Sequence, residues 1–254
     1  MSELNNTFIQ QQMSQGQLYL FDCIDSTNEY LLTHCKTVPQ GSVCIAKTQT
    51  AGRGRRGRQW IAPQGNLNYS LVWHYPIKQN LLLSPLSLII GLMVIESLQQ
   101  QGVKDLSIKW PNDIYHKSKK IAGVLVELKT SLPNIYLVMG IGINLAKIMD
   151  KQDKINQPVS DLSEYVIDYN QLVICLTKKL HQVLIDYPQT GFKSYAQIWQ
   201  HSDLFFQKEV SVITETQTYC GISQGINHKG ELLLKLPNNE ILMFSIGDVS
   251  LRQK

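Results

Sequence analysis

Apolar residues recur along this chain in the two periods that distinguish helices from strands. A helical period predicts two long helices, over residues 84–101 and 169–187, and Pro188 is expected to end the second. Short apolar runs predict strands at 18–24, 42–48, 66–74, 106–110, 121–128 and 135–143. The last two are apolar at most positions and form a predicted hairpin, so we expect them in the middle of a sheet covered by helices.

The character of the chain changes after about residue 203. Five short β segments follow, separated by turn residues, at 209–213, 218–222, 232–236, 241–244 and 249–251. Strands of this length and spacing predict a small barrel. We therefore expect two domains, a larger one over residues 1–203 and a small β domain over residues 204–254.

The beginning of the chain predicts little structure before its first strand. Residues 1–17 are polar and glutamine-rich, and we expect them to form a loose leader. Ser26 and Glu29 stand at the spacing of a capping box, which predicts a helix beginning just after Asp25. Apolar runs of about 18 residues are absent from the sequence, so we expect neither a membrane span nor a secretory signal.

Composition narrows the class of protein. The chain has 254 residues, of which 43% are apolar and 17% charged, enough to bury a core. A net charge of +4 is too small to make the whole surface a nucleic-acid binder, so any strong positive field must be local. The 5 cysteines include no CxxC pair. We expect them to be free thiols in a reducing cytoplasm, and we expect no metal site.

One segment concentrates the arginines. The chain has five arginines, and Arg53, Arg55, Arg56 and Arg58 fall within six residues, interleaved with Gly52, Gly54 and Gly57. Glycines let backbone N–H groups converge on an anion, and guanidinium groups grip anions bidentately. The pattern matches neither the lysine-containing phosphate loop nor the dinucleotide fingerprint. It favours phosphate or nucleotide binding, while a grip on RNA and a solvated charged loop stay open.

Like charges this close repel each other, and ordering each residue costs about 1–2 kcal/mol. We therefore expect the arginine–glycine loop to be mobile without a ligand and to be ordered by an anion. Low mobility of this loop in the ligand-free protein would contradict the expectation.

Two further segments place polar groups at the ends of apolar strands. Lys109-Trp110-Pro111-Asn112-Asp113 ends one strand, and Lys119-Lys120-Ile121-Ala122-Gly123 opens the next. This brings an ammonium beside Asn and Asp at a sheet edge, although a solvated lysine and a simple turn are the plainer interpretations. Gly140-Ile141-Gly142-Ile143-Asn144 marks either a close approach to the backbone or tight strand packing.

Taken together, these segments resemble a biotin protein ligase. They stand in the family's order, beginning with Asp25-Ser26-Thr27-Asn28 and the run from Gln49 to Trp60, and the resemblance covers nearly the whole chain from residue 18. It implies an α+β fold: a mixed β-sheet with helices, similar to a class II synthetase core, followed by a small SH3-like β-barrel. Only 24 residues precede Asp25, too few for the DNA-binding domain of some family members, so we expect the ligase-only form without repressor activity.

The resemblance implies a reaction in two steps. Biotin and ATP would form biotinyl-5′-AMP and pyrophosphate, with Mg²⁺ held mainly through the phosphates. The biotinyl group would then pass to a lysine of a biotin carboxyl carrier protein. The arginines suit the first step, because the carboxylate of biotin and the α-phosphate repel each other unless cations screen them. The expected enzyme is cytoplasmic and binds neither DNA nor membranes; the sequence leaves its oligomeric state open, a homodimer included.

The same resemblance implies which residues form the site. Those expected at biotin are Ser26, Thr27, Asn28, Gln49, Gly52, Arg53, Gly54, Arg55, Lys120 and Gly123. Those expected at the nucleotide are Arg55, Arg56, Arg58, Trp60, Asn112, Lys120 and Asn144. Catalytic roles fall to Lys120 and Arg55, and we add Asp113 as the base that helps deprotonate the acceptor lysine, whose ordinary pKa is near 10.4. The alternatives are a lipoate ligase, which shares the architecture, and an RNA-binding protein.

Overall fold

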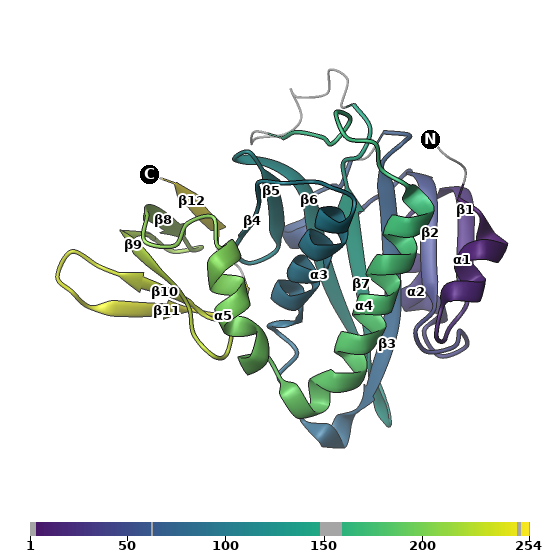
Figure 1. Cartoon of the computed structure of the whole chain (residues 1–254). Coiled ribbons are helices and arrows are strands. Elements are labelled where there is room, and N and C mark those ends of the chain that lie inside the picture. Colours follow the sequence, from purple (N-terminus) through teal and green to yellow (C-terminus); the bar gives the residue numbers. More distant parts are fainter. Residues whose placement is uncertain (1–3, 62, 148–158, 248–249, 254) are drawn as a thin grey trace.

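The larger part of the protein is built on a mixed sheet. The computed structural model describes residues 4–61, 63–147, 159–247 and 250–253 (Figure 1). The sheet has seven strands in the order β1-β2-β3-β7-β6-β5-β4. They are β1 (Leu18–Ile24), β2 (Val43–Gln49), β3 (Leu67–Pro76), β4 (Leu106–Lys109), β5 (Asp113–His116), β6 (Lys119–Ser131) and β7 (Asn134–Ile143). β1 and β2 pair in parallel and the other neighbours are antiparallel, which confirms the predicted mixed sheet and the β6–β7 hairpin.

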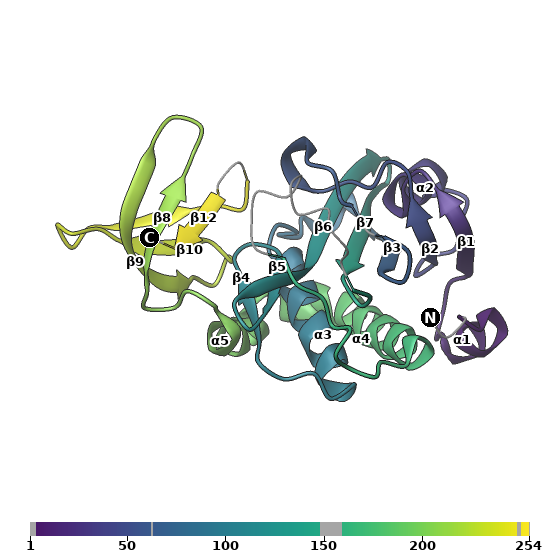
Figure 2. The ribbon, with the colours of Figure 1, turned by 90° about the horizontal axis from the view of Figure 1, so that it is seen from above.

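Helices cover both faces of this sheet (Figure 2). α3 (Leu86–Gln100) and α4 (Tyr169–Thr190) lie side by side on one face, and α2 (Thr27–His34) lies on the other. Successive side chains of β3 point to opposite faces of the sheet, as in any strand. Leu71 belongs to the large core, whereas Val72 packs in a smaller cluster beneath α2. The β6–β7 hairpin therefore runs through the middle of a layered core, as its apolar sequence predicts.

Two expectations about helices are wrong: that residues 1–17 form a loose leader, and that Pro188 ends the helix before it. The expected leader contains α1 (Asn6–Gln12), which Asn5 caps by accepting from the Phe8 N–H and which buries Ile9 completely. α4 continues past Pro188 to Thr190. Proline removes the N–H that would bond to Leu184 O, but the Tyr75 hydroxyl donates to this carbonyl at 2.6 Å instead. The helix therefore loses no hydrogen-bond partner at Leu184.

The C-terminal part is an antiparallel sheet of five strands in the order β11-β10-β9-β8-β12. They are β8 (Glu209–Ile213), β9 (Thr218–Ile226), β10 (Leu232–Lys235), β11 (Ile241–Phe244) and β12 (Ser250–Gln253). The strands are close to those predicted; Val249, in the last predicted segment, lies outside the described residues. β11 and β12 form the two edges and do not pair with each other within the described chain, so the expected small SH3-like barrel is not closed. Closure would require hydrogen bonds between these two edge strands, each of which has four residues.

The two parts share one core. α5 (Lys193–Ser202) leads into the C-terminal sheet, and Leu232, Leu234 and Val212 belong to the same apolar cluster as α3. Buried Trp110 donates its indole N–H to Gly230 O across the seam at 3.0 Å. The C-terminal sheet is therefore packed against the β4 end of the large sheet, opposite β1 (Figure 1).

A carboxyl group lies at this junction. Asp203 follows α5, its Oδ1 accepts from the Phe205 N–H at 2.9 Å, and its buried Oδ2 has no hydrogen-bond partner. Burial raises its pKa to about 6 from 3.8. Because the folded state binds the proton more tightly, the buried carboxylate destabilises the protein above pH 6, and this cost fades as the pH falls towards about 4.

Asp203→Asn is therefore expected to stabilise the protein at pH 8 by about 1–2 kcal/mol, because the amide keeps the bond to Phe205 without a buried charge. Thermal melts of both proteins between pH 4 and pH 8 measure the difference. We expect it to shrink steadily as the pH falls; a difference independent of pH would contradict the assignment.

Candidate active site

One large cavity collects nearly all the predicted site residues. Its volume is about 850 Å³, and it lies between the start of α2, the arginine–glycine loop, strands β5 to β7 and the beginning of the C-terminal part. The predicted residues that line it are Ser26, Thr27, Asn28, Gln49, Arg53, Gly54, Arg55, Arg56, Arg58, Trp60, Asn112, Asp113, Lys120, Gly123 and Asn144. Gly52 lies just behind, where a Cβ would stand 2.5 Å from Trp60 O.

One end of the cavity is a polar floor at the N-terminus of α2. Ser26 caps this helix through the Glu29 N–H, as predicted, but the Glu29 carboxylate turns away to Arg53 and leaves the capping box half formed. The Thr27 N–H donates to Gln49 Oε1 at 2.8 Å. Gln49 in turn donates from Nε2 to Asn68 Oδ1 at 3.2 Å, which fixes the orientation of its amide.

This floor has more acceptors than hydrogens. Its oxygen–oxygen contacts are Thr27 Oγ1 to Gln49 Oε1 at 3.1 Å, Ser70 Oγ to Thr27 Oγ1 at 2.7 Å and Ser70 Oγ to Asn28 Oδ1 at 2.6 Å. The two hydroxyl groups supply one hydrogen each, and the amide oxygens supply none. Because two hydrogens serve three contacts, the hydroxyls cannot fill both amide oxygens, and each such oxygen has two lone pairs to which an N–H group of a ligand can donate.

Sequence reasoning missed Asn68 and Ser70. Both lie on β3, two residues apart, and both are buried. Two polar residues at this spacing in an otherwise apolar strand share one face of the sheet. That spacing could have pointed to them, because buried polar side chains need hydrogen-bond partners. Here those partners are side chains of the site.

The arginine–glycine loop folds into a tight turn over the cavity. Arg53 and Gln59 form a bridge, and the Gly54 N–H donates to Arg58 O at 2.8 Å. Arg56 and Gly57 both have left-handed backbone angles, with φ of 58° and 68°. The expected mobility of this loop without ligand stays a prediction, which limited proteolysis with and without biotin would test.

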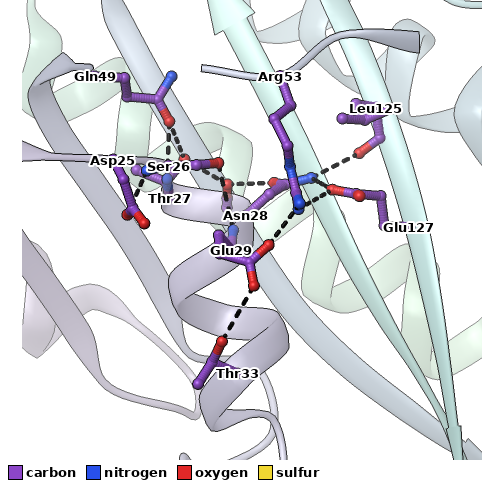
Figure 3. Close-up of polar contacts among 11 residues, drawn as sticks. Asp25, Ser26, Thr27, Asn28, Glu29, Thr33, Gln49, Arg53, Leu125 and Glu127 are labelled. Atoms are coloured by element: carbon purple, nitrogen blue, oxygen red, sulfur yellow. Dashed lines mark hydrogen bonds and ion pairs between the residues drawn. The ribbon is translucent and has the colours of Figure 1, made fainter. Parts of the chain in front are cut away.

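The loop arginines have different partners. Arg53 donates to Glu29 Oε2 at 2.5 Å and to Glu127 Oε2 at 2.7 Å, so two carboxylates compensate its charge (Figure 3). Arg55 donates to Asn112 Oδ1 at 3.2 Å and to Gly247 O at 2.5 Å, which connects the loop to the β5 end of the sheet and to the C-terminal part. Arg53 therefore holds the loop in place, and it lines the cavity together with Arg56 and Arg58.

Lys120 and its counter-ion lie inside the cavity beyond the polar floor. The Lys120 ammonium lies 2.6 Å from Asp113 Oδ1 and 5.9 Å from the centre of a Trp60 ring. Asp113 pairs with Gly123 in the β5–β6 ladder, and a Cβ on Gly123 would stand 3.4 Å from Lys120 Nζ. A lysine and its counter-ion thus share a mostly buried position between the two ends of the cavity, as the sequence suggested.

Two glycines of β7 admit side chains from elsewhere. A Cβ on Gly140 would lie 2.4 Å from Asn28 Oδ1, and one on Gly142 would lie 2.2 Å from the Trp60 ring. Both distances are far below any real contact. Of the two interpretations left open by the sequence, close approach to the backbone is the one confirmed, and the approaching groups are the site's own side chains.

The cavity is strongly cationic. Asp113 is the one carboxylate among its described lining residues, against several arginines and lysines. Burial lowers the pKa of the Lys109 ammonium from its ordinary value, while Asp113 acts in the opposite direction. Nearby Lys120, Arg252 and Arg58 lower it further. Lys109 and Arg252 were absent from the predicted site, and such a surplus of positive charge suits an anionic ligand.

Comparisons with known proteins decide the family. Residues 20–144 match the Biotin/lipoate A/B protein ligase family, and residues 205–252 match the Biotin protein ligase C terminal domain. The bifunctional ligase/repressor BirA of Escherichia coli is 37% identical over 98% of this chain and 78% of its own length. The chain belongs to the biotin protein ligase family. The enzyme class predicted from the sequence, a biotin ligase, is confirmed.

Other members of the family agree. The biotin–[acetyl-CoA-carboxylase] ligase of Paracoccus denitrificans is 31% identical over 84% of this chain and 92% of its own length. The structure of the Aquifex aeolicus biotin protein ligase in complex with biotin and ATP superposes with a TM-score of 0.81, at 30% identity, over 93% of this chain and 99% of that chain. The predicted α+β fold of a biotin ligase core is thereby confirmed. Across the described residues, no helix has the length and apolar character needed to span a bilayer.

Proposed function

We propose that this chain activates biotin with ATP and transfers it to a carrier protein. A carboxylate oxygen of biotin attacks the α-phosphorus and pyrophosphate leaves, which gives biotinyl-5′-AMP. The amine of a carrier lysine then attacks the acyl carbon and AMP leaves. The observation that carries the proposal is the single cavity that joins a donor-poor polar floor to a cationic end through Lys120.

The polar floor suits the ring of biotin. Both N–H groups of the ureido ring are donors, and the contacts among Thr27, Gln49, Ser70 and Asn28 leave acceptor lone pairs unfilled. We assign biotin to this end, with Ser26, Thr27, Asn28 and Gln49 as contacts. Gly54 and Gly123 line the cavity without side chains, so the ligand can approach their backbone closely, while Gly52 supports the loop next to Trp60.

The cationic end suits the nucleotide. We assign Arg55, Arg56, Arg58, Trp60, Asn112 and Asn144 to this side. Lys120 lies between the ends, where its charge can screen the carboxylate of biotin from the α-phosphate. Each charge-assisted hydrogen bond contributes about 1.5–3 kcal/mol, so Lys120 and Arg55 together can offset the repulsion of two anions.

The described residues do not form a metal cage of their own. Asp113 is paired with Lys120, and the described part of the chain contains no cluster of three acidic, histidine or cysteine side chains able to hold a metal ion. We therefore propose that Mg²⁺ arrives with ATP as part of the substrate and is held mainly through its phosphates.

Biotin-dependent exchange between ATP and labelled pyrophosphate tests the first step. We expect exchange with biotin, none without it, and none when lipoate replaces it. Lipoate-dependent exchange would favour the lipoate ligase instead. Absence of exchange, together with tight binding of single-stranded RNA that is lost at high salt, would favour the RNA-binding alternative.

Asp113 is our candidate base for the transfer step. Its carboxylate lies 2.6 Å from Lys120 and borders the cavity where the adenylate would lie. With pre-formed biotinyl-5′-AMP supplied, Asp113→Ala and Asp113→Asn are expected to slow biotinylation of the carrier at least about tenfold. Single-turnover rates measure the effect. Transfer at the wild-type rate in both variants would remove Asp113 from this role.

Further features belong to the same proposal. We place the domain boundary between residues 203 and 204, which is supported by the separate family matches on either side. The acceptor would be a biotin carboxyl carrier protein domain. Three further expectations stay predictions: a cytoplasmic location, no binding to DNA or membranes, and no repressor activity. The oligomeric state stays open, with a homodimer as one possibility.

A further inference from the structure

A carboxylate outside the main cavity connects two segments at the proposed biotin end. Glu127 lies on β6 and is not among the described residues lining the large cavity. Its Oε2 accepts from the Asn28 amide at 2.7 Å and from the Arg53 guanidinium at 2.7 Å (Figure 3). One oxygen thus joins the start of α2 to the start of the arginine–glycine loop.

The carboxylate determines which end of the Asn28 amide faces Ser70 in the polar floor. A carboxylate accepts hydrogen bonds and donates none, so Asn28 must turn Nδ2 towards Glu127, where it also lies 3.4 Å from Leu125 O. Oδ1 then faces the Ser70 hydroxyl at 2.6 Å. Asn28 therefore contributes an acceptor to the polar floor, and its position against Gly140 leaves it little space to rotate.

The same carboxylate helps to neutralise Arg53. The guanidinium lies between Glu29 on α2 and Glu127 on β6, and these ion pairs anchor the loop at its first arginine (Figure 3). Glu29 does not bond to Asn28; its other side-chain contact is the Thr33 hydroxyl at 3.3 Å. The two glutamates thus share one task, holding Arg53, and only Glu127 has the second task of orienting Asn28.

We infer that Glu127 is a positioning residue for biotin, which keeps the Asn28 oxygen turned to Ser70 as an acceptor of the polar floor while it anchors the arginine–glycine loop beside that floor. The inference rests on the proposed function. Glu127 does not touch the ligand in this proposal. It decides that Asn28 acts as a hydrogen-bond acceptor in the floor and not as a donor. Glutamine in its place can present either an oxygen or an N–H₂ group to Asn28. The Asn28 amide can then exchange its oxygen and nitrogen within the space that it already fills.

Calorimetry with biotin on three variants of the full chain tests this. Glu127→Gln is expected to weaken biotin binding about tenfold, and Glu29→Gln about two- to threefold, because it loses only a contact to Arg53. Glu96→Gln is the matched control: its ion pair with Lys179, also at 2.7 Å, lies between α3 and α4, and binding should be unchanged. In pyrophosphate exchange, Glu127→Gln should raise KM for biotin and leave kcat at saturating biotin near that of the wild type.

The results distinguish the role of Glu127 from the role of Asn28 and from the proposed function. Wild-type affinity in Glu127→Gln overturns the inference, and equal losses in Glu29→Gln and Glu127→Gln overturn the role of Asn28. A fall in kcat with unchanged KM also counts against positioning. If Glu127→Gln does not fold, Glu127→Asp, which draws the oxygen back from Asn28, carries the same test. No heat with biotin in the wild-type protein would instead show that the proposed function itself is wrong.

Discussion

Lys120→Ala is expected to lower biotin-dependent ATP–pyrophosphate exchange by about a thousandfold while the protein stays folded. The ammonium of Lys120 lies mostly buried between the polar and cationic ends of the cavity, next to Asp113. Removing it takes away the charge that screens the two reacting anions from each other. It also leaves Asp113 as an unpaired carboxylate facing both, so the repulsion that the enzyme must overcome increases.

The neighbouring lysine supplies the control. Lys119 is exposed, and Lys119→Ala should exchange pyrophosphate at the wild-type rate. The unpaired Asp113 in Lys120→Ala is expected to cost about 1–3 kcal/mol of stability, which thermal unfolding measures and which does not unfold a protein of ordinary stability. Normal exchange in a folded Lys120→Ala protein would refute the role of Lys120.

Gly142→Ala is expected to reduce kcat/KM for ATP about a hundredfold, with a smaller effect on biotin binding. The added Cβ would lie 2.2 Å from the Trp60 ring, and strand backbone cannot move away without breaking the β3–β7 and β6–β7 ladders. Trp60 must therefore swing out. It would lose its contact with Asn68 and draw the end of the arginine–glycine loop away from the nucleotide side.

Gly91→Ala is the control for adding a methyl group to a buried glycine. Its Cβ would meet the end of the flexible Ile108 side chain at 3.4 Å, an ordinary contact, and alanine favours the α3 helix. Steady-state kinetics with ATP varied at saturating biotin compare the two variants. Unchanged kinetics for Gly142→Ala would show that Trp60 does not need its place over β7.

Much of the large sheet could be predicted because its signals are local. The β6–β7 hairpin is a pair of long apolar runs, and β1, β2 and β3 lie close to their predicted bounds. β5 was missed because Pro111-Asn112 beside it signals a turn, and its four residues are held as a strand only by the ladders with β4 and β6. α5 was missed because its ten residues make a marginal helix alone, stabilised by burial of Trp199.

The candidate site was predictable for a different reason. Its motifs stand in unusual patterns of arginine, glycine and lysine, so nearly every residue that the resemblance to a family pointed to lines the cavity. The residues that form hydrogen bonds and ion pairs with those side chains could not be predicted from the resemblance. The pairing of Arg53 with Glu29 and Glu127 depends on the β6 strand passing the start of α2, which nothing in the local sequence states. Asn68 and Ser70 matter for the same non-local reason.

The shared core between the two parts constrains how this chain can be re-engineered or can evolve. Trp110 reaches across the seam to Gly230, and leucines of the C-terminal sheet are buried with those of α3. A chimaera that exchanges the C-terminal sheet for that of a distant relative would set unmatched surfaces against each other. The Trp110 N–H would keep an acceptor only if the new turn placed a backbone carbonyl where Gly230 O lies. Residues on opposite sides of the seam should therefore change together across lineages, so that the two halves are inherited as one unit.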